Sequence, residues 1–474
     1  MKKISCIGVD LGASGGKAAK GSFDGDKLII DDFIDFDNRA IETPNALYWN
    51  VFGLYNSILD VIAHYTNQCN IASIAIDTWG ASYGLLDNRN RLLEPVYHYR
   101  DQRTRHSVEN IYKIVDKKSV FRMTGCQCNR TYTLPQLYSY IEQGTNALTE
   151  ADKLLLLPDL LSYFLSGELS TEMTIAGTSA LLNTSQEDWC YELFQKLKIP
   201  THFLTNIVDA GTVKGKLRRT VGEKTGAGNT KVIATTAHDS AAAVAAIPGF
   251  GINKLYISIG TNINMGIETK ESIVSEAAFQ CGFKNTGGFG RSKIVYRDFA
   301  AFWLLNELKR ILETEGRSYS HADFISLAER TESKQVCFDL EEAEFSNADG
   351  DIRIKIDNYL KKTNQDSIKE DGEYVLCILE SISIKIKHYA DLLKNKLNIF
   401  YTGIYVVNGG SKNHLLMQMI SDALGEEVRA GMPYATLTGN ILTQLYAQGY
   451  VKTVDEIREL SRQSFMMKQY EPQN

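Results

Sequence analysis

One aspartate follows a predicted buried strand at a place where a general base could act. The stretch Thr235-Thr236-Ala237-His238-Asp239-Ser240 comes after the β-branched apolar run Lys231 to Ala234 and before a series of small residues. This pattern predicts a strand that leads into a tightly packed helix, with Asp239 at the junction. Its carboxylate could take the proton of a substrate hydroxyl, or it could simply cap the helix. These residues alone favour the cap.

A second aspartate, Asp10, precedes a glycine-rich turn. Its strand, Ile4 to Val9, runs into Asp10-Leu11-Gly12-Ala13-Ser14-Gly15-Gly16-Lys17. Such turns let the backbone come close to a ligand, and successive N–H groups in them can cradle phosphate oxygens. The turn differs from a Walker A loop, because residues 18–23 indicate a returning strand and a hairpin turn near Asp24 in place of a helix. An ordinary glycine-rich hairpin is the alternative that these residues alone favour.

Two further glycine-containing turns follow strands in the second half of the chain. The strand Ile404 to Val407 ends at Asn408-Gly409-Gly410-Ser411-Lys412-Asn413, and a helix from His414 to Leu424 is expected directly after it. Unpaired N–H groups and the dipole at a helix N-terminus both favour an anion or a nucleotide. The strand Leu255 to Ile259 leads in the same way into Gly260-Thr261-Asn262 and a returning strand near Gly266.

The elements around these turns alternate between strands and helices. Apolar residues at helical spacing predict helices over Val51–Tyr65, Leu155–Leu165 and Tyr374–Leu397, the second ending near Gly167. A buried strand is expected over Ile71–Ile76, and strands are also expected around the turn at 87–90 and over 97–101. Since strand ends in such α/β arrangements are where ligands bind, the chemistry is expected at these turns.

Length and composition indicate an ordinary globular chain of two domains. The 474 residues exceed what one core usually supports, and Pro248-Gly249-Phe250-Gly251 gives the expected boundary between domains 1–247 and 248–474. A net charge of −6 argues against a nucleic-acid surface. No apolar run approaches the ~20 residues of a membrane span, and the start lacks a signal peptide, so we expect a cytoplasmic protein. Of the eight cysteines only Cys126 and Cys128 lie close together, which is weak evidence for a metal.

The order of these motifs resembles that of the FGGY family of carbohydrate kinases, within the wider actin-like ATPase superfamily, and in particular its rhamnulokinases. Each match is short, but together they run from near the first residue to the last helix. The matching stretches are Asp10-Leu11-Gly12-Ala13-Ser14, Asp77-Thr78-Trp79-Gly80, Tyr99-Arg100-Asp101, Leu157-Pro158-Asp159, His238-Asp239, Ser258 to Thr261, Trp303-Leu304-Leu305, Asn408 to Asn413, and Leu437 to Asn440.

The resemblance implies an α/β fold of two actin-like (ribonuclease H-like) domains, each a five-stranded mixed sheet flanked by helices, with ATP and sugar meeting in a cleft between them. It implies ATP-dependent phosphorylation of the 1-hydroxyl of a ketose, with L-rhamnulose as the expected substrate and Mg²⁺ as the cofactor. The first domain would carry most of the sugar site and the second most of the nucleotide site. The expected partners are the ketose and ATP, with no nucleic acid and no membrane, and the chain would be a monomer or a homodimer.

The resemblance also assigns roles to individual residues. Asp239 would be the catalytic base, and Asp10 and Asp239 would hold Mg²⁺. Phosphoryl transfer needs these parts, together with donors on the spreading negative charge. The implied sugar-binding residues are Gly80, Ser82, His238, Ser240 and Asp298, and the implied ATP-binding residues are Ala13, Ser14, Gly15, Gly16, Lys17, Gly260, Thr261, Asn306, Gly409, Gly410 and Asn413.

Several positions depart from the rhamnulokinase pattern and leave the choice of sugar open. Ser82 stands where an aspartate is typical, and Lys17, Asn262, Asp298 and Tyr434 also differ from the usual residues. Because a buried site built for a hydroxyl discriminates strongly, such changes can redirect specificity. Residues 174–179 and 409–413 also resemble L-fuculokinases, so a kinase of that or another deoxyketose is the alternative. A catalytically idle regulator that binds sugar or nucleotide is the alternative from another class, which the retained Asp10 and Asp239 disfavour.

Overall fold

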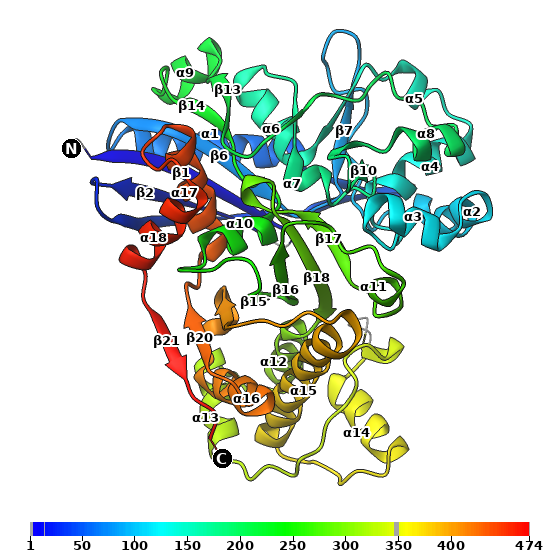
Figure 1. Cartoon of the computed structure of the whole chain (residues 1–474), viewed down its shortest axis with the longest axis vertical. Coiled ribbons are helices and arrows are strands. Elements are labelled where there is room, and N and C mark those ends of the chain that lie inside the picture. The colour runs from blue at the N-terminus through cyan, green and yellow to red at the C-terminus, as the bar shows by residue number, and fades with distance from the viewer. Residues whose placement is uncertain (1–2, 14, 346–349, 474) are drawn as a thin grey trace. The chain divides into compact units, whose positions relative to one another are not determined.

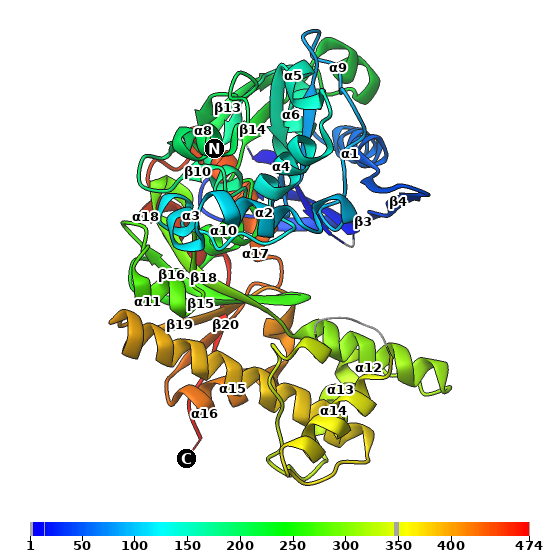
Figure 2. The same ribbon diagram turned by 90° about the vertical axis from the view of Figure 1, so that its right-hand side faces the viewer.

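The computed structural model describes residues 3–13, 15–345 and 350–473. The chain forms two compact units, in which helices accompany sheets as predicted (Figures 1 and 2). The units are not consecutive along the chain, and the assignment of 1–247 and 248–474 as functional domains stays a prediction. Unit 1 comprises Met1–Phe250, Glu268–Val295 and Ala435–Phe465, and unit 2 comprises Gly251–Ile267, Tyr296–Tyr434 and Met466–Asn474.

A mixed sheet forms the centre of unit 1. Among the described residues it has six strands in the order β13-β14-β6-β1-β2-β3, where the family resemblance implied five. The neighbours β1, β2 and β3 are antiparallel, whereas β6 runs parallel to β1 and β14 runs parallel to β6. The bounds are β1 (Ile4–Gly12), β2 (Gly15–Phe23), β3 (Leu28–Asp37), β6 (Ile71–Thr78), β13 (Thr212–Lys216) and β14 (Lys231–Ala234).

Helices cover both faces of the unit 1 sheet. On β1, Ile7 and Val9 belong to a core shared with α1 (Val51–Thr66) and α6 (Leu157–Ser166). The intervening Gly8 lies against Ile441 of α17 (Ala435–Ala447). Because alternate strand residues point to opposite faces, α17 lies on the face opposite α1.

The helix α17 also packs tightly on α10 (Asp239–Ala246), the helix that begins at the predicted base. A Cβ atom added to Gly439 would lie 1.8 Å from the carbonyl oxygen of Ala242, so only glycine permits this approach. Figure 1 shows the two helices side by side. The start of α10 is therefore held from one side by a close backbone contact.

Smaller elements complete unit 1 and contain a second core that includes Trp189, Phe194 and Phe203. Their bounds are β4 (Ala40–Thr43), β5 (Ala46–Trp49), β7 (Tyr83–Leu86), α2 (Ser107–Ile114), α3 (Lys117–Thr124), α4 (Thr133–Gln143), α5 (Ala147–Glu150), β8 (Lys153–Leu156), β9 (Thr171–Glu172), α7 (Met173–Ala176), β10 (Leu182–Asn183), β11 (Asp188–Trp189), α8 (Tyr191–Leu197), β12 (Ile207–Val208), α9 (Arg219–Thr225), α11 (Glu276–Gln280), β17 (Lys284–Gly287) and α18 (Val454–Ser464).

Unit 2 contains strands in the order β18-β16-β15-β19-β20-β21, where the family resemblance implied five strands. The central pairs β15–β19 and β19–β20 are parallel, β16 is antiparallel to β15, and β21 is antiparallel to β20. The long helix α15 lies beside α16, as Figure 2 shows. The bounds are β15 (Leu255–Ile259), β16 (Asn262–Thr269), β18 (Lys293–Ala300), α12 (Phe302–Thr314), α13 (His321–Glu329), α14 (Ile352–Lys362), α15 (Asp371–Leu397), β19 (Ile404–Val407), α16 (His414–Leu424), β20 (Val428–Gly431) and β21 (Met467–Tyr470).

The predicted strand over 97–101 is wrong, because this stretch forms turns and contributes only an isolated bridge between Tyr48 and Tyr97. The His98 ring accepts a hydrogen bond from the Arg100 N–H, and the Asp101 carboxylate accepts one from the Arg103 N–H. Side chains that bond to nearby backbone N–H groups in this way compete with strand pairing.

The predicted helix over 155–165 begins at Leu157 instead, because residues 153–156 pair with β7.

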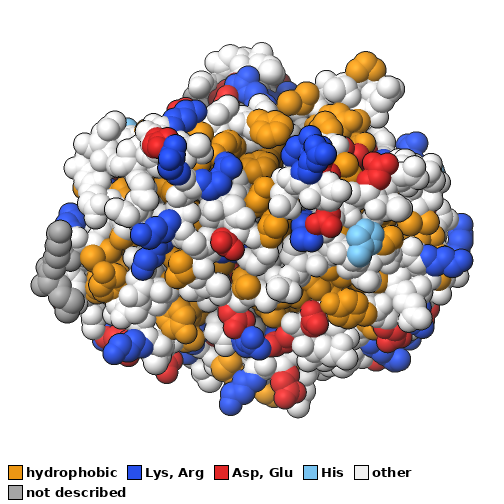
Figure 3. Space-filling view, turned by 90° about the horizontal axis from the view of Figure 1, so that it is seen from above, with side chains coloured by type: hydrophobic (Ala, Val, Ile, Leu, Met, Phe, Trp, Pro, Cys, Tyr) orange, Lys and Arg blue, Asp and Glu red, His pale blue; other side chains and the backbone are white. Residues whose placement is uncertain are grey.

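On the face drawn in Figure 3, acidic and basic side chains are interspersed, in keeping with the modest net charge of −6. Within the described parts of the chain, no helix has both the length and the apolar character that a membrane span requires.

Candidate active site

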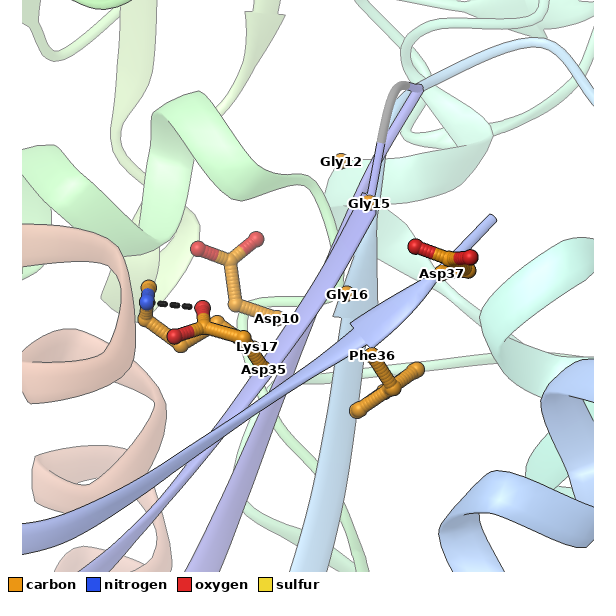
Figure 4. Close-up of a pocket in the computed structure, with 8 residues that line it drawn as sticks. All are labelled: Asp10, Gly12, Gly15, Gly16, Lys17, Asp35, Phe36 and Asp37. Atoms are coloured by element: carbon orange, nitrogen blue, oxygen red, sulfur yellow. Dashed lines mark hydrogen bonds and ion pairs between the residues drawn. The ribbon is translucent and has the colours of Figure 1, made fainter. Parts of the chain in front are cut away.

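A row of charged side chains crosses four adjacent strands of the unit 1 sheet. In the strand register, Asp10 on β1 pairs with Asp77 on β6 and with Lys17 on β2, and Lys17 pairs with Asp35 on β3. Figure 4 shows Asp10, Lys17 and Asp35 on one side of these strands and Phe36 on the other, with an ion pair joining Lys17 to Asp35. The row therefore places three carboxylates against one ammonium group.

Two neighbouring carboxylates of this row, Asp77 at its end and Asp10 next to it, are poorly able to carry two negative charges. Burial, followed by the charge of Asp239, raises the pKa of Asp10 to about 7. Burial, followed by the charge of Asp10, raises the pKa of Asp77 well above its ordinary value. A bound cation, or a proton shared between the carboxylates, would stabilise such a cluster. Carboxyl groups with pKa values raised in this way are typical of functional sites.

A polar side chain of α17 holds Asp77 in place. Asn440 is fully buried, and its Nδ2 donates to Asp77 Oδ2 at 2.6 Å. Its Oδ1 accepts from Gln444 Nε2, which also donates to the Ile7 carbonyl of β1. Asn440 was expected only as part of a family motif and Asp77 had no predicted role, although Asp77 lies near the end of β6 much as Asp10 lies near the end of β1.

Asp239 lies in the first turn of α10, and His238 is the N-cap residue. The alternative that Asp239 caps the helix is therefore wrong. The Asp239 side chain is 33% exposed, and a substrate hydroxyl can therefore reach it. Its Oδ1 accepts from the Ser240 N–H at 2.5 Å and lies 3.4 Å from His238 Nε2. The predicted trio His238, Asp239 and Ser240 is thus a single local cluster, and it lies near Asp10, whose pKa it raises.

The peptide before Asp239 is bound by a buried carboxylate that the sequence analysis missed. Glu172 Oε2 accepts a hydrogen bond from the Ala237 N–H at 3.2 Å, and Thr174 Oγ1 accepts one from the His238 N–H at 3.2 Å. Burial raises the pKa of Glu172 to about 7. Glu172 ends a strand of only two residues, which gave no periodic signal, and it is 65 residues from Ala237 in sequence.

The loop after β6 contains Gly80 and Ser82, two of the predicted sugar-binding residues. A Cβ atom on Gly80 would lie 2.7 Å from Thr178 Cβ, so this position needs glycine. Ser82 is 1% exposed, and its hydroxyl oxygen accepts from the indole N–H groups of Trp49 at 3.0 Å and Trp79 at 2.9 Å. Ser82 therefore links two indole rings in the interior of unit 1.

The turn between β1 and β2 borders an open pocket of about 390 Å³. Gly15, Gly16 and Lys17 line it, whereas Ala13 is exposed in the turn itself. Ser14, also predicted to bind ATP, lies outside the described residues. Asp10, Gly12, Asp35, Phe36 and Asp37 complete the lining (Figure 4).

The predicted nucleotide-binding residues of unit 2 lie mainly at two strand ends. Gly260 and Thr261 are exposed in the turn between β15 and β16. Gly409 and Gly410 follow β19 in a short 3₁₀ helix, with Gly410 packed against Ile259 of β15. Asn413 is the N-cap of α16 and accepts from the Leu416 N–H at 3.0 Å.

Two predicted residues lie elsewhere in unit 2. Asn306 is exposed in the first half of α12, and Asp298 is exposed near the end of β18. Across the described residues, no group of three or more His, Cys, Asp or Glu side chains is arranged to hold a metal ion. A protein site with fewer carboxylates still suits Mg²⁺, which is commonly bound by one or two carboxylates together with substrate phosphates.

Comparison with known proteins assigns the chain to a family. Residues 5–246 match the N-terminal domain, and residues 255–448 the C-terminal domain, of the FGGY family of carbohydrate kinases. The chain belongs to the FGGY family of carbohydrate kinases. A rhamnulokinase of Bacteroides thetaiotaomicron is 32% identical over 100% of this chain and 96% of its own length. A rhamnulokinase of Bacillus subtilis is 29% identical over 98% of this chain and 95% of its own length.

Solved structures of other sugar kinases share the fold of this FGGY chain. A gluconate kinase from Lactobacillus acidophilus superimposes with a TM-score of 0.84 at 16% identity, covering 100% of this chain and 94% of its own. A ligand-bound xylulose kinase from the same organism gives a TM-score of 0.81 at 16% identity, with 99% and 94% covered. The predictions of an α/β actin-like fold and of an ATP-dependent carbohydrate kinase are confirmed.

Proposed function

We propose that this chain transfers the γ-phosphoryl group of ATP to the 1-hydroxyl of a ketose, and that the ketose is L-rhamnulose. The observation that carries the proposal is the approach of a partly exposed carboxylate, Asp239, to the half-buried Asp10 and the buried Asp77. The curated rhamnulokinases, similar over nearly the whole chain, support the choice of sugar. We further propose that the reaction takes place in the cytoplasm.

Asp239 acts as the general base in this proposal. Its accessible carboxylate takes the proton of the sugar 1-hydroxyl as that oxygen attacks the γ-phosphorus. The Ser240 N–H and the nearby His238 fix the orientation of Oδ1. A base held in this way reduces the entropy that must be lost to align the hydroxyl for in-line attack.

The residues present fit a Mg²⁺ ion. Asp10 and Asp239 offer hard oxygen donors, and desolvation together with the negative charge of Asp239 raises the pKa of Asp10, a combination that a bound cation would relieve. When bound, Mg²⁺ would neutralise charge on the ATP phosphates. Lys17, which is paired with Asp35 at the edge of the same pocket, adds positive charge on the phosphate side.

Backbone N–H groups are proposed to bind the phosphates. Residues 13–17 contribute them in unit 1, and Gly260, Thr261, Gly409 and Gly410 contribute them in unit 2. Asn306 and Asn413 are proposed to lie near the nucleotide. Gly80, His238, Ser240 and Asp298 are proposed to contact the sugar, with Ser82 acting through Trp49 and Trp79.

The experiment is a coupled assay of ADP release by the purified chain with Mg²⁺-ATP and a panel of ketoses. The panel contains L-rhamnulose, L-fuculose, D-xylulose and D-fructose, and phosphorus NMR identifies the phosphorylated carbon. The proposal expects the highest kcat/KM for L-rhamnulose and a 1-phosphate product. A preference for L-fuculose would support the alternative deoxyketose kinase, and binding without turnover of any sugar would support a regulator.

A further inference from the structure

The backbone immediately before Asp239 is held on both of its sides. On one side the Ala237 carbonyl accepts a hydrogen bond from the Thr78 N–H of β6 at 2.9 Å. On the other side its N–H donates to Glu172 Oε2, and the next N–H, of His238, donates to Thr174 Oγ1. Glu172, Thr174 and Ala237 are all at most 2% exposed. Hydrogen bonds in so dry an environment are stronger than at the surface.

One carboxylate oxygen of Glu172 accepts three hydrogen bonds. Glu172 Oε2 accepts from the Thr174 hydroxyl at 2.6 Å, from the Ile175 N–H at 3.1 Å and from the Ala237 N–H at 3.2 Å. The other oxygen, Oε1, is buried without a hydrogen-bond partner among the described residues. The carboxylate thus joins the start of α7 to the peptide that leads into α10.

The position of Glu172 is itself fixed by a buried ion pair. Its N–H donates to Asp159 Oδ1 at 3.2 Å, and Asp159 pairs with Lys214 at 2.5 Å. Lys214 also donates to the Ser170 carbonyl at 2.8 Å. Both charged side chains are at most 2% exposed. A continuous chain of buried polar contacts therefore runs from β13, through α6 and β9, to the peptide before Asp239.

We propose that Glu172 is a positioning residue for the phosphoryl transfer: together with Thr174 it fixes the backbone of Ala237 and His238, and so sets where the Asp239 carboxylate lies. The inference rests on the proposed role of Asp239 as the base. A displacement of about 1 Å at a reacting group can reduce the rate by about a hundredfold. Loss of the Glu172 carboxylate should therefore act on kcat.

The purely structural alternative is that Glu172 serves only as the N-cap of α7. That role predicts a loss of stability without a specific loss of rate. Thr171 provides a matched control on the same two-residue strand, because it is equally buried and its hydroxyl bonds to Thr205. Thr171→Val removes a buried hydrogen bond that does not reach Ala237.

The test compares Glu172→Ala, Glu172→Gln and Thr171→Val in the full chain, assayed well below their Tm values. Glu172→Ala should lower kcat about 10- to 100-fold with the KM for ATP within about threefold of wild type. Glu172→Gln keeps an oxygen that can accept the same donors, so it should recover kcat to within about fivefold of wild type despite a lower Tm. Thr171→Val should lower Tm and leave kcat within twofold.

A second readout does not depend on turnover. Amide hydrogen exchange over a peptide spanning 235–240 should accelerate at least tenfold in Glu172→Ala and stay near wild type in Thr171→Val. Should Glu172→Ala fail to fold, Thr174→Val leaves the Glu172 carboxylate in place but removes both the acceptor of the His238 N–H and the hydroxyl that donates to Glu172 Oε2, and it should still lower kcat several-fold.

Some outcomes would overturn the inference. They are wild-type kcat in Glu172→Ala, equal losses of kcat in Glu172→Ala and Thr171→Val, or an unchanged kcat in Thr174→Val when Glu172→Ala does not fold. An inactive wild-type chain would instead count against the proposed function. In that case exchange over 235–240 still reports whether Glu172 holds this backbone.

Discussion

Ser82 holds two tryptophans whose orientation we expect to matter for the sugar. Its hydroxyl accepts the indole N–H groups of Trp49 and Trp79, and all three side chains are buried. Ser82→Ala would leave two buried donors without their acceptor. Each such loss costs about 1–3 kcal/mol, so the variant should be less stable by roughly 2–6 kcal/mol.

This magnitude is large enough to measure by thermal unfolding. Unit 1 is larger than the 150–250 residues for which about 1 kcal/mol corresponds to a Tm shift of roughly 2–4 °C, so at about 2 °C per kcal/mol or less its transition should fall by up to roughly 12 °C. Ser139→Ala is the control, because Ser139 is also buried and its hydroxyl donates to one acceptor, the Gln136 carbonyl. Equal shifts in the two variants would refute the idea that Ser82 bridges two indoles.

Ser82→Asp tests the link to sugar choice. A carboxylate can accept both indole N–H groups and would restore the residue typical of rhamnulokinases. We expect kcat/KM for L-rhamnulose to rise about tenfold relative to other ketoses, or ~1.4 kcal/mol. An unchanged ranking of ketoses would show that the residue at this position does not influence the sugar site, and a wild type already strongly selective for L-rhamnulose would show that the aspartate is not needed.

Three further variants test other parts of the account. Asp10→Ala should raise the Mg²⁺ concentration needed for half-maximal turnover, and an unchanged Mg²⁺ titration would remove Asp10 from the metal site. Asn440→Leu leaves Asp77 Oδ2 without its 2.6 Å donor and should lower the free energy of unfolding by about 1–3 kcal/mol, as a denaturant titration would measure. Burial raises the pKa of Glu341, but Lys385, Tyr389 and Arg297 outweigh burial and lower this pKa from 4.5 to about 2. Glu341 therefore stabilises the folded chain above pH 4.5, and this contribution is lost as the pH falls through about 2. Glu341→Gln should accordingly show a smaller fall of Tm between pH 5 and pH 2 than wild type, and parallel curves would contradict this.

The sequence predicted the parts of the site that follow periodic elements. Asp10 and Asp239 each come after a short apolar run, and the structure places Asp10 near the end of β1 and Asp239 in the first turn of the helix that follows β14. The row of Asp77, Asp10, Lys17 and Asp35 could not be predicted, because it depends on the register of four strands. Register follows from tertiary pairing, which the alternation of residue types leaves undetermined for strands buried on both faces.

Residues that act through distant partners also escaped prediction. Asn440 and Asp77 are 363 residues apart, and the amide lies in a helix that also buries Gln444 and three threonines, so nothing local singles it out. Ser82 stays a predicted sugar-site residue, but its hydrogen bond to Trp49 could not be predicted, because Trp49 lies 33 residues earlier, beyond any local motif. In each case the chemistry depends on a hydrogen bond that only the fold creates.

The most direct test of the central claim is the turnover of Asp239→Asn with L-rhamnulose and Mg²⁺-ATP. Asparagine has a similar shape but cannot accept the proton of the sugar hydroxyl, so kcat should fall by ~10²–10⁴ while the Kd for ATP, measured without Mg²⁺, stays within about twofold of wild type. Equilibrium binding of ATP and single-turnover kinetics on the same protein separate the two quantities. Turnover within threefold of wild type would contradict the assignment of Asp239 as the base.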